Sequence, residues 1–384
     1  MPAISAADGP VAVTGVSGYT GGHLVRHLVH YGYTVRACLR DSSSWRGLDA
    51  VQYLEKLPGV EIMSGCDLFV AGSFDSAFEG CSAVFHVAAV LGNSAQEGAQ
   101  PHASGHQGEY TYAGGLEGTQ NVLDAVSKSG SVQRLIYTSS VGAVANQSKE
   151  PGHEWTELDW ASDGRKPEEW PGDTGGTSGI DEMDRTYYAK SKVDTEVLVN
   201  GAASASGGAW DVVTINPAMI CGPILFAAQN GQWIEMIGQL AAGETVRNMS
   251  WNIIDVRDLC AAHRLAAESR LDHAATAGGA RYIMHGSGGP ERRPGTGGSV
   301  ELAGQMTAII RASFPRFVVV EPQTRDSKTG ELIVVRAANP QVNDSKKAKE
   351  LLGVTLRPVE ETVRECVESA VELGLISPQL LQKL

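Results

Sequence analysis

The stretch TGVSGYTG, residues 14–21, decides the fold of the first part of the chain. It follows the short β-branched run Val11–Thr14 and precedes residues 23–31, whose apolar side chains recur at helical spacing. The order is therefore strand, glycine turn and helix. This order is typical of the turn that binds the pyrophosphate of a dinucleotide at the positive N-terminus of a helix.

Each glycine of this GxxGxxG pattern has an expected task. Gly15 allows the tight turn, Gly18 lets the backbone approach a ligand closely, and Gly21 lets the helix pack against the strand. Together with Tyr19 they are the candidate cofactor-binding residues of this turn. A glycine triplet also occurs in purely structural turns, so the alternative without a ligand stays open.

The alternation of strands and helices continues up to about residue 217. Further β-branched and apolar runs predict five more strands, and Glu117–Ser127 has helical spacing. Repeated βα units build a doubly wound parallel sheet, so the predicted fold class is α/β of the Rossmann type. The five strands are expected at Thr34–Leu39, Val60–Met63, Ala83–Val87, Arg134–Thr138 and Asp211–Asn216.

The rhythm breaks after this point, which predicts two domains. We expect a dinucleotide-binding Rossmann domain over residues 8–217 and a smaller, mainly substrate-binding domain over residues 218–384. Segments within residues 250–285 are left free to return to the first domain, because chain order does not fix which domain a segment joins. The later elements are expected at Asp255–Ser269 (helix), Arg281–His285 (strand) and Val359–Leu373 (helix).

Three glycine-rich polar stretches interrupt this pattern, at residues 92–115, 161–185 and 286–298. Loops of this length are usually functional lids or solvated insertions, and composition does not decide between the two. The second stretch lies between two candidate catalytic residues, Ser140 and Tyr188.

The charge of the chain excludes one class of partner. The 384 residues include 31 Lys and Arg against 44 Asp and Glu, which gives a formal net charge of −13. A protein that binds nucleic acid must neutralise phosphates, so no nucleic-acid partner is expected. The stretch 212–234 is uncharged, but its prolines, asparagines and glutamines make it a poor membrane helix. We expect no membrane partner and, with no signal or transit peptide visible, a cytoplasmic location.

Six cysteines stand at positions 38, 66, 81, 221, 260 and 366, mostly inside apolar runs and without a CxxC pair. This spacing favours neither disulfides nor a metal site. Buried reduced thiols are expected instead.

The end of the second predicted strand indicates the cofactor preference. An NAD enzyme would place Asp or Glu here for the ribose hydroxyls, whereas this chain has Leu39 followed by Arg40. A guanidinium suits a 2′-phosphate through bidentate, charge-assisted hydrogen bonds. NADP(H) is therefore expected over NAD. Asp41 follows directly, which leaves open that Arg40 is a solvated surface residue.

Tyr188 and Lys192 stand four residues apart, which places both side chains on one face of a helix. Ser140 gives this pair its context, because it closely follows the strand Arg134–Thr138. Ligands of an open α/β sheet bind outside the carboxyl ends of the strands, so Ser140 can face a cofactor there. Adjacent hydroxyls at a strand end also form simple turns, which is the alternative for Ser139 and Ser140.

Six phrases in one order resemble the extended short-chain dehydrogenase/reductase superfamily, which includes NAD-dependent epimerases and dehydratases. Two longer phrases, GYTVRACLRDSSS and DSKKAKELLGVTLRPVEETV, are similar to its dihydroflavonol-reductase-like branch, with cinnamoyl-CoA reductases and aldehyde or ketone reductases. The resemblance covers roughly residues 10–285 and 343–374. The six phrases are TGVSGYTG at 14–21, CDL at 66–68, FHVAA at 85–89, YTSSVGAV at 137–144, YYAKSK at 187–192 and NPAMICGP at 216–223.

The resemblance implies a catalytic role for three residues. Tyr188 is implied as the general acid, and Ser140 as the anchor of the carbonyl oxygen. Lys192 is implied as the residue that lowers the pKa of Tyr188 and holds the nicotinamide ribose. An ammonium group beside a phenol favours the phenolate by charge attraction, so the chemistry agrees with these roles.

The resemblance also implies contacts along the cofactor. Asp67 and Leu68 would flank the adenine, and Ala88 and Ala89 would line the cofactor. The backbone after Pro217 would meet the nicotinamide amide. Each position has a structural alternative, for example that Asp67 caps a turn and that Pro217 ends a strand.

Several departures from the family pattern bear on the substrate. Gly115 stands where some extended members have a catalytic Asn, and DRTYYAK at 184–190 replaces the NWYCY signature of cinnamoyl-CoA reductases. Ala145 stands where plant flavonoid reductases bind substrate with Asn or Asp, although Asn146 is adjacent. Neither an Asn-based tetrad nor flavonoid specificity is predicted.

The leading hypothesis is an NADP-dependent reductase that transfers hydride to an aldehyde or ketone with a hydrophobic body. The alternatives are a sugar-nucleotide epimerase or dehydratase, which uses the same three residues, a sterol-type dehydrogenase, and a non-catalytic NADP-sensing regulator. A small-molecule carbonyl or alcohol is the expected partner. The sequence leaves both a monomer and a homodimer open.

Overall fold

The computed structural model describes most of the chain. The described residues are 3–90, 107–145, 153–162, 182–229, 231, 234–235, 238, 253–286, 302–314, 324–325, 332–333, 341–342 and 345–376. The three predicted loops lie largely outside these ranges. Residues 107–115 and 182–185, however, belong to helices, so the first two interruptions end earlier than predicted.

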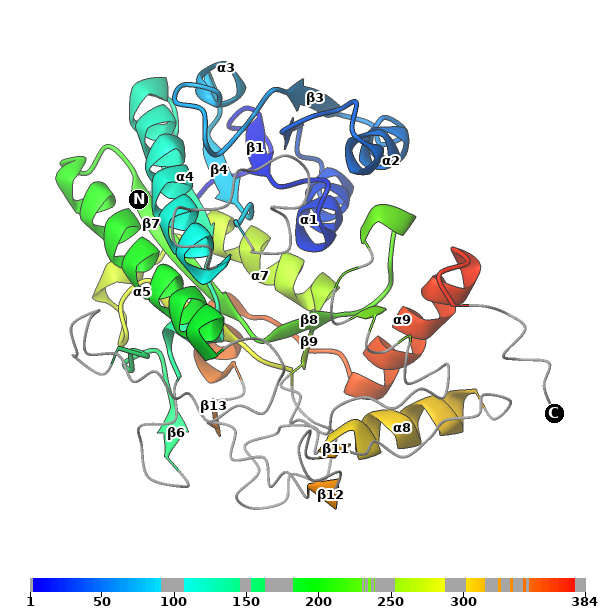
Figure 1. The fold of residues 1–384 in the computed structure, drawn as a ribbon. Coiled ribbons are helices and arrows are strands. Elements are labelled where there is room, and N and C mark those ends of the chain that lie inside the picture. The colour runs from blue at the N-terminus through cyan, green and yellow to red at the C-terminus, as the bar shows by residue number, and fades with distance from the viewer. Residues whose placement is uncertain are drawn as a thin grey trace.

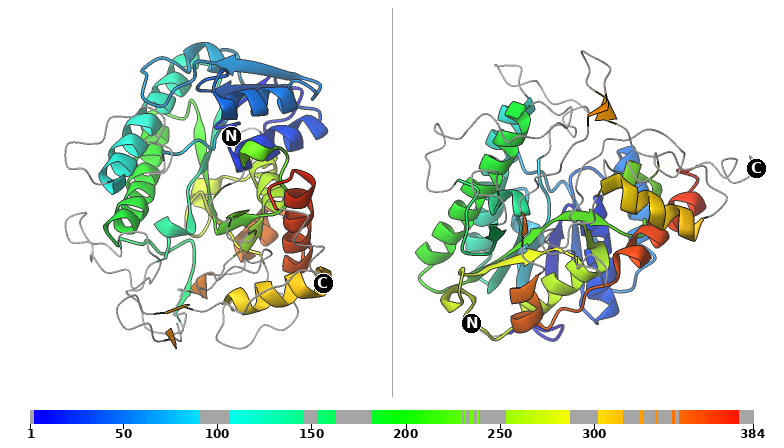
Figure 2. Two further views of the ribbon diagram at one scale, coloured as in Figure 1. Left: turned by 45° about the vertical axis from the view of Figure 1, so that its right-hand side comes forward. Right: turned by 90° about the horizontal axis from the view of Figure 1, so that it is seen from below.

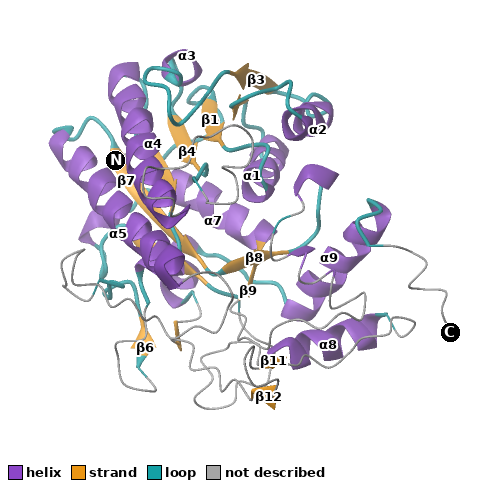
Figure 3. Cartoon of the chain, in the orientation of Figure 1, coloured by secondary structure: helices purple, strands orange, loops and turns teal. Residues whose placement is uncertain are grey.

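Seven parallel strands form the central sheet, in the order β10-β7-β5-β4-β1-β2-β3 (Figures 1 and 3). This order reverses direction next to β1, which places the ends of β1 and β4 side by side at the carboxyl edge of the sheet. The predicted α/β doubly wound class is confirmed. The strands are β1 Val11–Thr14, β2 Val35–Leu39, β3 Val60–Ser64, β4 Ala83–His86, β5 Arg134–Thr138, β7 Asp211–Pro217 and β10 Arg281–Met284.

Helices cover both faces of this sheet (Figure 2). Alternate residues of a strand point to opposite faces. Val11 and Val13 pack with α1, α2 and α7, whereas Ala12 packs with α3, α4 and α5. These helices are α1 Tyr19–His30, α2 Trp45–Leu54, α3 Asp75–Phe78, α4 Gln107–Ser129, α5 Glu182–Ala205 and α7 Val256–Glu268.

A second, smaller core lies beside the sheet. Strands β8 (Met219–Cys221) and β9 (Ile253–Asp255) pair in parallel there and pack with α8 (Leu302–Ser313) and α9 (Val359–Glu372). Between these segments the chain returns to the main sheet, because β10 pairs with β7. The proposed division at residue 217 stays a prediction. The remaining short strands are β6 Glu154–Trp155, β11 Thr324–Arg325, β12 Leu332–Ile333 and β13 Gln341–Val342.

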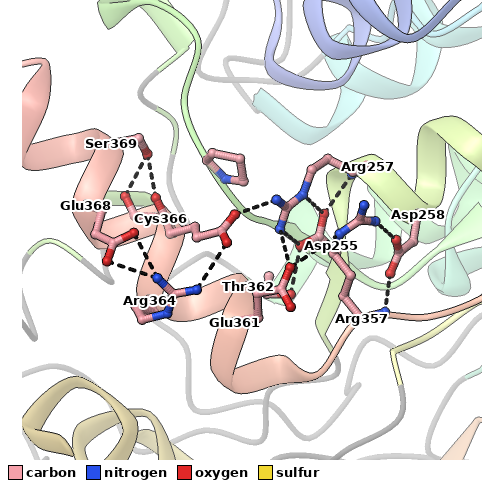
Figure 4. A network of polar contacts seen from close by, with 12 residues as sticks. Asp255, Arg257, Asp258, Arg357, Glu361, Thr362, Arg364, Cys366, Glu368 and Ser369 are labelled. Carbon is pink, nitrogen blue, oxygen red and sulfur yellow. Dashed lines mark hydrogen bonds and ion pairs between the residues drawn. The ribbon is translucent and has the colours of Figure 1, made fainter. Parts of the chain in front are cut away.

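A polar network joins α9 to the start of α7 (Figure 4). Asp255 is almost completely buried, and its carboxylate accepts hydrogen bonds from Arg257 and from Thr362 of α9. Arg257 also pairs with Glu365 of α9. Because a buried carboxylate is costly unless it is paired, these contacts fix α9 against the rest of the protein.

Three further observations concern the cysteines, membrane-spanning helices and metal-ligating side chains. All six cysteines are buried and free, which confirms buried thiols. In the part of the chain that the structure describes, no helix is both long enough and apolar enough to cross a membrane. Within the same residues, no three or more His, Cys, Asp or Glu side chains gather as a metal site would require.

Candidate active site

The glycine turn before α1 leaves little room for side chains. Gly15 has a φ of +73°, and a Cβ atom there would lie 2.8 Å from Cα of Ala88. A Cβ atom at Gly21 would lie 2.2 Å from the carbonyl oxygen of Gly15. At Gly18 the distance to the same oxygen is 3.1 Å. The backbone therefore requires glycine at residues 15 and 21, and it brings Ala88 directly against the turn.

The N-terminus of α1 is open. Among the described residues, no side chain accepts a hydrogen bond from its first N–H groups. The ring of Tyr19 packs against the second core, so the turn presents the backbone of this residue. Gln229 stabilises the turn, because its Nε2 donates hydrogen bonds to the carbonyls of Gly18 and Tyr19 at 3.3 and 3.4 Å. Unpaired N–H groups at a helix N-terminus are suited to bind a phosphate group.

Thr14 links the turn to the end of β4. Its Oγ1 accepts hydrogen bonds from the N–H groups of Val87 and Ala88, both at 3.1 Å. The Thr14 hydroxyl proton is then left for Nδ1 of His86, which lies 2.9 Å away. This assignment places the ring proton of neutral His86 on Nε2. Burial lowers the pKa of His86 to about 3, so the ring is neutral at physiological pH.

The candidate adenosine end lies where β2 and β3 finish. Leu39 is buried and Arg40 is exposed, so the guanidinium is the first side chain after β2 to reach solvent. Asp67 caps the next turn, where its Oδ1 accepts from the N–H of Phe69 at 2.9 Å. Asp67 and Leu68 are only partly buried. This edge is therefore accessible to a ligand.

Asp41 is occupied by its own turn. Its Oδ1 accepts from the N–H and the hydroxyl of Ser43, at 2.8 and 2.6 Å. These hydrogen bonds hold the pKa of Asp41 below its ordinary value. The carboxylate thus caps the loop before α2, and these contacts hold it away from a ligand that Arg40 would bind.

Ser140, Tyr188 and Lys192 meet at the carboxyl end of β5. Ser140 Oγ accepts from the N–H of Gly142 at 3.1 Å. A Cβ atom on Gly142 would lie 3.4 Å from both Ser140 Oγ and Cε1 of Tyr188, so both side chains border the same small space. Lys192 Nζ donates to the carbonyl of Thr138 at 3.3 Å and lies 6.0 Å from the centre of the Tyr188 ring.

Burial dominates the electrostatics of this group. Desolvation raises the pKa of Tyr188 above its ordinary value, and the hydrogen bond with Ser140 opposes this only in part. Desolvation also lowers the pKa of Lys192 to about 8, against the opposing charge of Glu196. The Lys192 ammonium group donates to the carbonyl of Thr138 in this geometry, and its effect on the pKa of Tyr188 stays a prediction. Tyr188 is therefore protonated at neutral pH, as a proton donor must be.

A pocket beside Tyr188 and Lys192 gathers several of the predicted residues. Leu68, Ala88 and Ala89 line it together with these two. Ser140, Arg40 and Asp67 do not line this pocket, and Pro217 is buried where β7 ends. The pocket is also lined by His86, Val90, Thr111, Gly115, Thr119, Tyr137, Ser191 and Thr195.

Gly115 has a packing explanation. A Cβ atom there would lie 2.4 Å from Oγ of Ser191, because α4 and α5 approach closely at this point. An Asn side chain at position 115 would have to displace Ser191. The close packing of α4 and α5 thus accounts for glycine at this position.

Sequence reasoning missed four polar residues around this site. They are His86, Glu196, Asn216 and Arg281, all buried. A signal existed for two of them: His86 interrupts an apolar strand, and Glu196 stands four residues after Lys192 on the same helix face.

Comparisons with known proteins agree with this architecture. The model of the NAD dependent epimerase/dehydratase family matches residues 11–276. The cinnamoyl-CoA reductase CAD2 of Medicago truncatula is 30% identical over 373 residues, which cover 94% of this chain and 95% of that protein. The dihydroflavonol 4-reductase of Hordeum vulgare is 28% identical over 261 residues, 66% of this chain and 65% of the relative.

Solved structures show the same fold. The yeast methylglyoxal/isovaleraldehyde reductase Gre2, complexed with NADPH, aligns with a TM-score of 0.70 at 20% identity, covering 95% of this chain and 99% of that one. Vestitone reductase from alfalfa aligns with a TM-score of 0.68 at 23% identity, with the same coverage. On the family match and the similarity to the Medicago truncatula reductase, the chain belongs to the NAD-dependent epimerase/dehydratase family, in the branch of dihydroflavonol and cinnamoyl-CoA reductases, and is an NAD(P)-dependent oxidoreductase.

Proposed function

We propose that this protein is an NADPH-dependent reductase of aldehydes or ketones, with Tyr188 as the proton donor. The observation that carries the proposal is the convergence of Ser140 Oγ and the Tyr188 ring on the space beside Gly142, with Lys192 one helical turn further on. Two hydroxyl groups directed at one point can bind the oxygen of a carbonyl group.

The residues present fit the cofactor. The turn at residues 15–21 offers backbone N–H groups in a cradle that side chains would fill. Arg40 would hold the 2′-phosphate, and Lys192 would hold the nicotinamide ribose. Ala88 and Ala89 would line the path between the two ends. The bound NADPH supplies a hydride for the carbonyl carbon.

The chain itself handles the carbonyl oxygen. Ser140 and Tyr188 would donate hydrogen bonds to it, and these strengthen as negative charge develops there. Tyr188, which burial keeps protonated, then gives its proton to that oxygen. The positive charge of Lys192 would stabilise the negative charge that is left on the tyrosine oxygen when this proton is given up. The product is an alcohol, from one hydride and one proton.

The names of the relatives support the substrate class. They are reductases of methylglyoxal and isovaleraldehyde, of a dihydroflavonol and of cinnamoyl-CoA. We infer a small aldehyde or ketone with a hydrophobic body. Neither a nucleic acid nor a membrane is a proposed partner, and the cytosol is the proposed location. The acidic net charge of −13 supports the first of these inferences.

The test uses pure protein, NADPH and a panel of aldehydes and ketones, with the absorbance of the reduced nicotinamide as the readout. Tyr188→Phe should lower kcat by roughly 10² to 10⁴-fold, because one general acid is lost. The Kd for NADPH should change less than about twofold, since the ring is retained. Tyr187→Phe is the matched control, because it removes the same group from a ring that packs against Tyr112. It should keep near-normal turnover.

Two outcomes would contradict the proposal. Near-normal reduction by Tyr188→Phe would show that this residue is not the acid. Turnover of sugar nucleotides, without net NADPH oxidation on any carbonyl of the panel, would instead establish the epimerase alternative.

A further inference from the structure

Glu196 is a buried carboxylate below the candidate catalytic residues. It follows Tyr188 and Lys192 at four-residue steps along α5, so the three side chains share one face of the helix. The Glu196 side chain is 0% exposed and its partner Arg281 is 4% exposed. A charge removed from water in this way is tolerated only when several donors surround it.

Three donors surround Glu196, and each comes from a different segment. Oε1 accepts from Ser139 Oγ and from Asn216 Nδ2, both at 2.5 Å. Oε2 accepts from Arg281 Nε at 2.7 Å. The carboxylate thus joins α5 to the carboxyl ends of β5 and β7 and to Arg281, the first residue of β10.

Two of these donors hold the backbone of Ser140. Ser139 is its direct neighbour in the chain, and Asn216 Nδ2 also donates to the Ser140 carbonyl at 3.1 Å. Because Nδ2 serves two acceptors, the orientation of the Asn216 amide is fixed. Its Oδ1 is then left without a hydrogen bond to any described residue. The Asn216 amide is therefore held between Glu196 and the backbone of Ser140.

Arg281 extends the network to a second segment, residues 157–160. Its Nη1 donates to the carbonyls of Glu157 and Asp159, at 3.0 and 2.6 Å, and its Nη2 donates to the carbonyl of Ala143 at 3.2 Å. The guanidinium carbon lies 3.8 Å from the centre of the Trp160 ring. Residues 157–160 are therefore fixed over the turn that begins at Ser140.

We propose that Glu196 and Arg281 act as a positioning pair that holds Ser140 and residues 157–160 in register with Tyr188 and Lys192. None of the hydrogen bonds of this pair involves the glycine turn or the end of β2, so its charge reaches the cofactor only through Lys192. The inference rests on the proposed function, because it assumes that Ser140 and Tyr188 act on the substrate.

A second buried pair provides a matched control. Arg134, at the opposite end of β5, is 0% exposed and pairs with Asp211 at 2.7 Å. Like Arg281, it also donates to several backbone carbonyls, those of Ala266, Ala267 and Ser269. The two pairs are similar in chemistry and both arginines are buried, although Asp211 is 28% exposed and Glu196 is 0% exposed. Only the pair of Glu196 and Arg281 touches the site.

The test measures kcat, the Kd for NADPH and Tm in parallel. Glu196→Gln should lower kcat roughly 10- to 100-fold, because misplacement of a reacting group by about 1 Å costs up to 10²-fold. The Kd should be unchanged when it is measured well below the Lys192 pKa of about 8, where Lys192 keeps its proton. Glu196→Gln leaves the buried charge of Arg281 without its partner, so its Tm should fall. The double variant Glu196→Gln/Arg281→Met removes both buried charges, so its Tm should be higher than that of Glu196→Gln while its kcat stays low. The control variant Arg134→Met/Asp211→Asn should have the kcat of the wild type when both are assayed at a temperature below the Tm of the variant.

A milder variant covers the case in which the charge variants do not fold. Ser139→Ala removes one hydroxyl and no charge, and it should lower kcat several-fold with Tm almost unchanged. The proposal is overturned if Ser139→Ala keeps full kcat, or if the double variant regains kcat together with Tm. Tyr188→Phe in the same assay distinguishes failure of the proposed function from failure of the positioning role. If Tyr188→Phe remains active, the proposed function has failed; if it is inactive while the outcomes above are found, only the positioning role has failed.

Discussion

Arg40→Ala tests whether this exposed guanidinium selects NADPH over NADH. Arg40 is the first exposed side chain after β2, and it makes no hydrogen bond or ion pair with the residues that the structure describes. It is therefore free to turn toward a phosphate group. The competing carboxylate of Asp41 is held by Ser43 at 2.8 and 2.6 Å.

The size of the effect follows from the kind of contact. A hydrogen bond to a charged group contributes about 1.5 to 3 kcal/mol. This corresponds to roughly a 10- to 150-fold change in specificity, because each 1.4 kcal/mol is tenfold. Arg40 is exposed, so screening by salt should bring the value toward the lower end at physiological ionic strength.

The assay compares kcat/KM for NADPH and NADH in the wild type and in Arg40→Ala. The wild type should prefer NADPH, and the variant should lose most of this preference through a weaker use of NADPH. Arg46→Ala is the control, since the Arg46 guanidinium lies 5.2 Å from the centre of the Trp45 ring; it should change the ratio less. Equal use of both cofactors by the wild type would refute the reasoning, as would an unchanged ratio in Arg40→Ala.

Two further predictions concern Lys192 and the glycine turn. The Kd for NADPH should rise as the pH increases through about 8, because the Lys192 ammonium then loses the proton it would donate to the ribose; Lys192→Arg should stay flat from about pH 6.5 to 9.5, and a flat wild type would contradict this. Gly21→Ala should lower the free energy of unfolding by about 1–3 kcal/mol and weaken NADPH binding, because its Cβ would lie 2.2 Å from a backbone oxygen. Gly18→Ala, with 3.1 Å to the same oxygen, should be milder in thermal unfolding, and equal losses would contradict the packing argument.

Most strands of the main sheet could be predicted from sequence because they are buried on both faces, whereas β3, at one edge, is partly exposed. β5 has the predicted bounds, Arg134–Thr138, since its run of apolar and β-branched residues reports burial directly. The starts of helices were less accessible. α1 begins at Tyr19 and α4 at Gln107, earlier than the apolar spacing indicated.

Glycine explains the missed part of α4. Residues 114, 115 and 118 lie inside this helix and pack against Phe69, Ser191 and Leu68. Glycine normally signals a break in a helix, so the sequence predicts a loop over residues 92–115, although Gly114 and Gly115 serve close packing inside α4. Only the tertiary contact reveals its purpose.

The candidate catalytic residues could be found by local spacing, whereas their support could not. Tyr188 and Lys192 are neighbours on a helix, and Ser140 follows a predicted strand. Glu196 and Arg281 are 85 residues apart, and no periodicity relates them. Partners brought together by the order of strands in a sheet leave no mark in a single sequence.

The network that joins α9 to α7 also has a consequence for the order of synthesis. Arg257 and Glu365 are 108 residues apart, a distance that a ribosome covers in roughly 5 to 20 s at about 5–20 residues per second. The last strand of the main sheet ends at Met284. The sheet can therefore be complete before Thr362, which donates a hydrogen bond to Asp255, has been synthesised. At this stage a nascent chain can contain the complete main sheet, while the second core still lacks α9. We therefore expect the second core to be accessible to chaperones and proteases from the time the sheet has formed until α9 has been synthesised and has packed.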